Sequence, residues 1–190
     1  QAYVVFDMNK ANVLEHVLRT NPAECIVIFA GRKIEVKNLN RHLQKRGFNA
    51  RGMHSDLDQS EREETMLAFR NRKLRVLVAT DVVSRGIDID DIDLVINYDV
   101  PKDPEDYVHR VGRTARAQRK GTAITFVNER EMREFGRIEA LIGYEVKKMP
   151  MPEGLPPGPQ YDPKGGRREK SNGHRGGGGR QRPDFHPRLG

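Results

Sequence analysis

Four short stretches of the chain are almost continuously apolar and rich in β-branched residues. Such runs are typical of strands that are buried on both faces of a parallel sheet. We therefore predict four central strands, at Ile26–Ala30, Val76–Thr80, Leu94–Tyr98 and Thr122–Val127.

Amphipathic stretches follow these runs, with apolar residues at the spacing of one helical face. They predict helices at Ile34–Arg46, Ser60–Arg70, Pro104–Val111 and Glu129–Ile142. Strands that alternate with helices favour an α/β fold, with a mostly parallel sheet and helices on both of its faces. Candidate edge strands are Tyr3–Phe6 and Glu145–Met149.

The composition changes sharply at Pro150. Residues 151–190 hold seven prolines and ten glycines but few large apolar residues, which is too little apolar surface to offset the entropy of ordering the chain. The same segment carries eight Lys and Arg against four Asp and Glu. We therefore predict one folded domain over 1–150 and a flexible basic tail over 151–190.

The overall charge and the cysteine content narrow the class of protein. A formal net charge of +7 suits a polyanionic partner. The single cysteine, Cys25, excludes a disulfide within the chain and fits a reducing compartment, and it lies in an apolar run as a small buried hydrophobe would. No apolar run is long enough to cross a bilayer, and the N-terminal residues Gln1–Val4 show no charged-then-apolar targeting pattern. Because the chain begins with Gln1, we expect a fragment of a longer, cytoplasmic protein without membrane contact.

Doubly wound sheets bind ligands beyond the carboxyl ends of their strands, and polar clusters occur in such positions. In the segment Tyr107–Arg116, arginines recur at every third position: Arg110, Arg113 and Arg116. On one helical face their guanidinium groups would converge, which is costly unless an anion lies among them. The spacing fits an ordinary solvated basic helix equally well.

A second cluster, Ala79–Asp88, follows a predicted strand directly. It offers a hydroxyl and backbone N–H groups to a phosphate, and a carboxylate to a sugar hydroxyl. The same residues also fit a turn in which Asp81 caps a short helix. The two readings are compatible.

A third cluster, His54–Arg62, contains the signal for the start of a helix. Asp58 or Ser60 is the expected N-cap, with acidic residues in the first turn. Gln59 and Arg62 would then lie on one side of that turn, where a helix N-terminus favours anions.

Taken in this order, the clusters resemble the C-terminal RecA-like domain of the DEAD-box RNA helicases of superfamily 2. The resemblance covers roughly residues 1–145. Its five segments are Ile26–Ala30 (motif IV), His54–Arg62 (HGxxxQxxR), Ala79–Asp88 (motif V), Asp93–Pro101 and His109–Arg116 (HRxGRTxR, motif VI). The leading His109 favours DEAD-box proteins over DExH relatives, in which Gln commonly stands at this position.

The sequence departs from the family pattern in several places. Ser55 and Ala115 replace usual glycines, Gln118 replaces another, and Arg32 stands where the family often has Thr. Arg32 puts the usual hydroxyl contact in doubt, although Arg can still bind phosphate. The chain contains no GxxxxGK[ST] loop, no DEAD tetrapeptide and no Ser-Ala-Thr motif. In the family these lie in the preceding domain, so we expect this chain alone to be inactive.

The resemblance implies a role for each matched residue. In the family, two RecA-like domains close over ATP and RNA together. Expected arginine fingers are Arg113 and Arg116; expected ATP or interdomain contacts are Gly86, Asp88, His109 and Arg110; expected RNA-backbone contacts are Arg32, Gln59, Arg62 and Thr80. ATP with Mg²⁺ would be held mainly by the N-terminal RecA-like domain, and no metal ligand is assigned here. The Arg- and Gly-rich tail would tether RNA or, on a plainer reading, act as a linker.

Two other functions compete with an RNA helicase. One is a superfamily 2 translocase that acts on DNA, against which the HRxGRTxR form of the last segment argues. The other is a non-catalytic RNA-binding scaffold, against which the presence of Asp88, Arg113 and Arg116 argues. The sequence does not name the physiological RNA.

Overall fold

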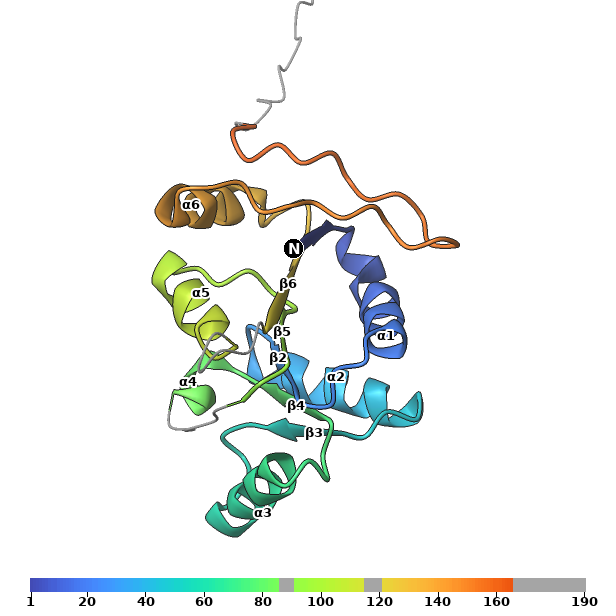
Figure 1. Cartoon of the computed structure of the whole chain (residues 1–190), viewed down its shortest axis with the longest axis vertical. Coiled ribbons are helices and arrows are strands. Elements are labelled where there is room, and N and C mark those ends of the chain that lie inside the picture. Colours follow the sequence, from blue (N-terminus) through green and yellow to red (C-terminus); the bar gives the residue numbers. More distant parts are fainter. Residues whose placement is uncertain (86–90, 115–120, 166–190) are drawn as a thin grey trace, which may run out of the picture.

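The computed structural model describes residues 1–85, 91–114 and 121–165. Within these ranges the chain forms a parallel sheet with helices on both faces (Figure 1). The strands are β1 (Ala2–Val4), β2 (Ile26–Phe29), β3 (Ala50–Met53), β4 (Val76–Ala79), β5 (Leu94–Asn97) and β6 (Thr122–Val127). The helices are a 3₁₀ turn, η1 (Asp7–Asn9), and α1 (Lys10–Thr20), α2 (Lys33–Lys45), α3 (Gln59–Arg70), α4 (Asp81–Ser84), α5 (Pro104–Val111) and α6 (Met132–Ile142).

The six strands run parallel in the order β1-β6-β5-β2-β4-β3. The three central strands β5, β2 and β4 are buried along their whole length, as apolar runs of this kind require. The predicted α/β fold and all four predicted strands are confirmed.

Alternate residues of each strand face two separate cores. On one face, α1 and α2 pack Leu14, Leu18 and Leu43 against Ile28 and Phe126. On the other face, α3 covers β2 and β4, while α5 and α6 cover the β6 side. Burial of both faces explains why the central strands are continuous apolar runs rather than alternating ones.

Local signals set the helix boundaries. Asp58 caps α3 in a reciprocal arrangement with Glu61, as the third cluster predicted. The helix expected from Glu129 begins three residues later, at Met132, because the Asn128 side chain accepts the Arg130 and Glu131 N–H groups in a turn.

The two predicted edge strands differ from the structure in extent. β1 covers Ala2–Val4 rather than Tyr3–Phe6. The second contributes only an isolated bridge, in which Ala2 donates to the backbone oxygen of Lys147 at 2.8 Å and accepts from Met149 at 2.7 Å. The strand β3 was not anticipated as an apolar run, since its sequence is Ala-Arg-Gly-Met.

Residues 151–165 pack against the domain, and we call them the strap. Met151 and Leu155 contact the core beneath α1, and Tyr161 donates to Glu139 of α6 at 2.7 Å. At Gly158 the strap lies so close to β1 that an added Cβ would stand 1.8 Å from the Val4 oxygen. The expectation that the chain is flexible from residue 151 is therefore wrong for the strap, because its few apolar residues each reach a core.

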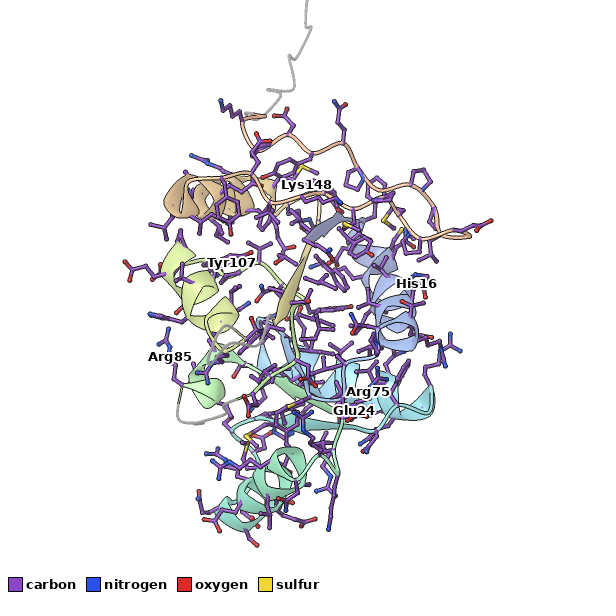
Figure 2. All side chains as sticks on the ribbon, viewed as in Figure 1. His16, Glu24, Arg75, Arg85, Tyr107 and Lys148 are labelled. Carbon is purple, nitrogen blue, oxygen red and sulfur yellow. The ribbon has the colours of Figure 1, made fainter. Side chains whose placement is uncertain are left out.

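Tyr161 joins the strap to the second face of the sheet. Its ring packs edge-on against Phe135 of α6, with the centroids 6.1 Å apart. Nζ of Lys148, which is labelled beside α6 in Figure 2, lies 4.1 Å from the centroid of the Tyr161 ring. In the described part of the chain, no helix is both long enough and apolar enough to cross a membrane.

Candidate functional site

The carboxyl ends of the parallel strands meet at one edge of the sheet, and Arg110 of α5 points into that edge. Arg110 is only 3% exposed. Its Nε donates to Oδ1 of Asp81 at 2.6 Å, and its Nη2 donates to the other oxygen of the same carboxylate. This bidentate ion pair ties α5 to the first residue of α4.

Three further contacts surround the same guanidinium group. Nη1 of Arg110 donates to Oδ1 of Asn97 at 3.0 Å and to the backbone oxygen of Asp99 at 3.1 Å. The group also lies 4.8 Å from the ring centroid of Phe29. Arg110 therefore holds the ends of β2, β4 and β5 together from within the domain.

Arg113 lies in the turn after α5. The helix ends at Val111, and the Arg113 N–H donates to the Arg110 oxygen at 3.3 Å. The expectation that these arginines share a helical face is wrong for this pair, because the helix stops between them and Arg110 points inward. Arg116 lies outside the described residues, as do Gly86 and Asp88, and their roles stay predictions. His109 is exposed on α5.

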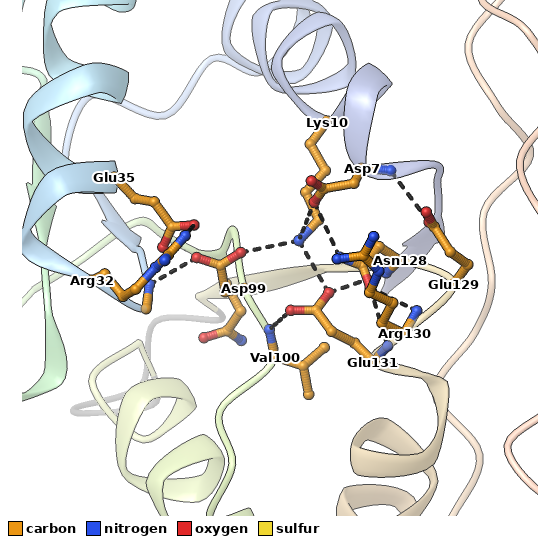
Figure 3. A network of polar contacts seen from close by, with 12 residues as sticks. Asp7, Lys10, Arg32, Glu35, Asp99, Val100, Asn128, Glu129, Arg130 and Glu131 are labelled. Carbon is orange, nitrogen blue, oxygen red and sulfur yellow. Dashed lines mark hydrogen bonds and ion pairs between the residues drawn. The ribbon is translucent and has the colours of Figure 1, made fainter.

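A polar network begins at Asp99, which follows β5 (Figure 3). One of its carboxylate oxygens accepts the Gly31 N–H at 2.7 Å, at the end of β2. The other accepts from Nζ of Lys10 at 3.0 Å. Lys10 also donates to Glu131 at 3.0 Å, and Glu131 accepts the Val100 N–H at 3.1 Å. The network thus fixes the loops after β2 and β5 to the start of α1.

Lys10 is 1% exposed and is the charged centre of that network. Burial by itself would lower the pKa of its ammonium group, but the carboxylates of Glu131 and Asp99 more than offset this and hold the pKa above its usual value. Lys10 therefore stays protonated, and its carboxylate partners give the buried charge the compensation that it needs.

The first turn of α3 carries two of the predicted RNA contacts. Gln59 is exposed and donates to Glu63 at 2.9 Å. Nε of Arg62 is buried and has no hydrogen-bond partner among the described residues. A groove of about 450 Å³ runs beside it and is lined by Met53 of β3, Val83 of α4 and residues of α3 that include Met66. A buried N–H without an acceptor is costly, so Arg62 is suited to an incoming anion.

The loop after β3 is held by two lysines of α2. Lys33 donates to the Asp56 carboxylate at 2.9 Å, and Lys37 donates to its other oxygen. These hydrogen bonds, first from Lys37 and then from Lys33, lower the pKa of Asp56 to about 2. His54 lies in the same loop, and burial, together with the charge of Lys37, lowers the pKa of its imidazole. At neutral pH His54 is therefore uncharged.

The other two predicted RNA contacts have different surroundings. Arg32 is exposed at the N-cap of α2 and pairs with Glu35 at 3.1 Å. Thr80 is the N-cap of α4, and its side chain makes no capping hydrogen bond to that helix. Asp81, the predicted cap, instead pairs with Arg110. The Thr80 hydroxyl is thus not committed to capping α4.

Several residues of the site were not singled out by the sequence. Asn97 ends β5 and Asp99 lies two residues beyond it, and the strand-end rule pointed to this loop without giving either side chain a role. Lys10 and Glu131 gave no signal, because a lysine and a glutamate far apart in the chain look like ordinary surface charges. In the described ranges, no group of three His, Cys, Asp or Glu residues is placed to hold a metal ion.

Comparison with known proteins bears on these arrangements. Residues 9–118 match the family described as the helicase conserved C-terminal domain. The chain is 47% identical over 128 residues to the ATP-dependent RNA helicase CshA of Listeria monocytogenes, covering 67% of this chain and 25% of that protein. It is 42% identical over 159 residues to the ATP-dependent RNA helicase RhlB of Pseudomonas putida, covering 83% of this chain and 40% of that protein.

The fold is similar to that of a DEAD box protein from the hyperthermophile Methanococcus jannaschii, with a TM-score of 0.73 and 39% identity. That match covers 78% of this chain and 41% of the other. The observed sheet and helices thus have the RecA-like arrangement that the sequence implied. The chain spans a quarter to two fifths of the length of the two RNA helicases that it matches.

Proposed function

Because the chain belongs to the family of helicase conserved C-terminal domains and matches DEAD-box proteins, we propose that it is the C-terminal half of an ATP-dependent RNA helicase. The whole protein would locally unwind or remodel RNA in the cytoplasm. This chain would supply RNA-backbone contacts and arginine fingers to an N-terminal RecA-like domain that binds ATP with Mg²⁺.

The observation that carries the RNA part of the proposal is the buried, unpartnered Nε of Arg62, in the described part of the chain. It lies in the first turn of α3, where the helix dipole also favours an anion. Thr80, whose hydroxyl does not cap α4, would add a second phosphate contact. Contacts of this kind go to the backbone, so binding would be largely independent of the base sequence.

The role of Arg113 depends on the rigid frame behind it. Arg110 holds the end of α5 against the strand ends through Asp81 and Asn97, and Arg113 follows in the next turn. We infer that Arg110 acts as a positioning residue for Arg113 and Arg116 rather than as a direct contact of the N-terminal domain. Bound ATP would supply the phosphoryl group whose transfer such arginines stabilise.

The residues of this chain are suited to contact the triphosphate of ATP from one side, but not to form its main binding site. The chain has arginines but no GxxxxGK[ST] loop to cradle phosphates. Gly86 and Asp88 would meet the nucleoside from this side. The basic segment beyond the strap, with Arg167, Arg168 and Arg175, would tether RNA through charge.

The test is ATP hydrolysis by the full-length protein, measured with no nucleic acid, with single-stranded RNA and with single-stranded DNA. Stimulation by RNA alone supports the proposal. Equal or greater stimulation by DNA would indicate a DNA translocase. RNA binding without any hydrolysis would indicate a scaffold that has kept the fold.

A further inference from the structure

The outer face of α6 carries two arginines one helical turn apart. Arg133 and Arg137 are both exposed, and together with Ala140 they line a groove of about 630 Å³. Tyr144 lies just beyond the end of α6, lines the same groove and is 66% exposed. An exposed aromatic ring beside basic side chains is the combination that binds single-stranded nucleic acid.

Two residues of the strap, Pro163 and Lys164, form the opposite wall of this groove. Pro163 of the strap lies against Gly136 of α6, so closely that an added Cβ at Gly136 would stand 2.6 Å from Cβ of Pro163. Lys164 lines the groove from the strap side. The wall is fixed in place by Tyr161, whose hydroxyl donates to Glu139 at 2.7 Å. The groove is therefore a formed feature of the fold.

The charge that the groove presents is mainly positive. Glu139 borders it, but its carboxylate is occupied by Tyr161 and Lys148 and by the Val146 N–H at 2.8 Å. Glu145 is the remaining acidic residue, against three basic residues, which are Arg133, Arg137 and Lys164. A polyanion complements this arrangement.

The position of the groove separates it from the predicted RNA contacts. α6 and α3 lie at opposite ends of the molecule in Figure 1. The strap delivers the chain to Gly165, beside the groove, and the sequence that follows contains Arg167 and Arg168. The basic segment therefore begins at this groove and not at α3.

We propose that the groove between α6 and the strap is a second binding site for single-stranded RNA. Arg133, Arg137 and Lys164 bind phosphates, and a base stacks on Tyr144. This inference rests on the proposed function, since it assumes that RNA is the ligand of the protein. The site extends the RNA path away from α3 and lets the basic segment act on the same strand.

The test uses the 190-residue chain and a fluorescently labelled single-stranded RNA in a binding titration. Arg133→Gln with Arg137→Gln removes two phosphate contacts. We expect affinity at about 0.1 M salt to fall roughly tenfold, and the log–log salt slope to decrease by about 1.4. The matched control is Arg41→Gln with Lys45→Gln, two exposed residues of α2 that also lie one turn apart. We expect little change in the control.

A second pair of variants tests stacking without any change of charge. Tyr144→Ala should weaken binding roughly five- to a hundredfold, as the loss of one stacked base does, whereas Tyr144→Phe should bind normally. Tyr144 is mostly exposed, so thermal melting of all variants should match that of the unaltered chain. This measurement excludes misfolding as the cause of lost binding.

Three outcomes overturn the inference. In one, the double variant of α6 and the double variant of α2 weaken RNA binding equally, which would mean that RNA is held by general charge attraction and not at the groove. In another, Tyr144→Ala binds RNA normally while a poly-glutamate peptide competes as well as RNA does, which means a surface for acidic proteins. In the last, neither the double variant of α6 nor Tyr144→Ala changes affinity while Arg62→Gln does, which leaves the proposed function standing. Failure of the unaltered chain to bind RNA at all would count against both proposals.

Discussion

Arg110 and Asp81 are 29 positions apart in sequence, yet they form a bidentate ion pair with 2.6 Å between Nε and Oδ1. The pair joins the segment after β4 to α5, and these are the two segments that carry motifs V and VI of the family. A displacement of one segment relative to the other would therefore strain a directional contact in which Arg110 is buried.

Arg110→Gln should destabilise the chain by about 3 kcal/mol or somewhat more. The change removes a bidentate ion pair with Asp81 in which the arginine side chain is 3% exposed, and breaking such a buried pair is expensive. Urea unfolding of the 190-residue chain measures the loss.

The control for that change is Arg85→Gln, which removes a more exposed ion pair with Asp106 at 2.6 Å. Because Arg85 is 64% exposed, the loss should stay below about 1 kcal/mol. Equal losses in the two variants would show that Arg110 is not a buried clamp.

Arg113→Lys in the full-length protein should reduce RNA-stimulated ATP hydrolysis by on the order of a thousandfold. Lysine keeps the charge but lacks the planar fork that grips two phosphate oxygens. Arg116→Lys should act in the same way. Steady-state hydrolysis at saturating RNA is the measurement, with thermal melting as the control for folding. Normal hydrolysis by either variant would remove that residue from the arginine fingers.

Arg62→Gln should weaken the binding of single-stranded RNA and lower the log–log salt slope by about 0.7, the value for one phosphate contact. Its stability should not fall, since Nε of Arg62 has no hydrogen-bond partner to lose among the described residues. A fluorescence titration at several salt concentrations checks both slope and affinity. Lys45→Gln, which removes one charge from the surface of α2, is the matched control and should leave the slope nearly unchanged.

Acid should loosen the strap through Glu139. Burial would raise the pKa of this carboxyl, but hydrogen bonds from Lys148 and Tyr161 outweigh burial and hold the pKa below its usual value. The contribution of ionised Glu139 to the stability of the fold is therefore fully present above the ordinary glutamate pKa of about 4.3. It is lost as the pH falls through the lower pKa that Glu139 has in the folded chain.

The corresponding variant is Glu139→Gln, which cannot titrate. Urea unfolding at about pH 6 and about pH 3 should show a large difference in stability between the unaltered chain and the variant at the higher pH, and a smaller one at the lower pH. A difference that stays constant with pH would mean that Glu139 does not couple the strap to protonation.

The central strands and α5 could be predicted because their signals are local. Runs such as Leu94–Asn97 are apolar throughout, and Asp103 with Pro104 marks the start of α5 unambiguously. The inward direction of Arg110 could not be predicted, since it depends on Asp81 and Asn97 approaching from other strands. Motif spacing identified the residue, but only the tertiary structure shows what it holds.

The order of the strap was not predicted, because the composition of residues 151–190 describes the average of the whole segment and not the contacts of single residues. Its prolines and glycines signalled disorder, whereas order comes from a few contacts made by Leu155, Tyr161 and their neighbours. Proline also limits the freedom of the unfolded chain, so fewer contacts suffice to order the strap. Lys10 was missed for a related reason, since nothing in a sequence distinguishes a lysine with three carboxylates around it from one in water.

The outer edge of the first strand is covered only by residues that come more than a hundred positions later in the chain. β1 pairs with β6, in the register Ala2 with Thr125, and its outer side meets Lys147, Met149 and Gly158. During synthesis on the ribosome, more than a hundred residues must be added after β1 before β6, its partner in the sheet, is complete. A chain shortened before Gly158 would keep the Ala2 hydrogen bonds to Lys147 and Met149 but would uncover the Val4 end of this edge, and an uncovered edge can pair with another molecule. We expect such shortened chains to associate more readily than the unaltered chain.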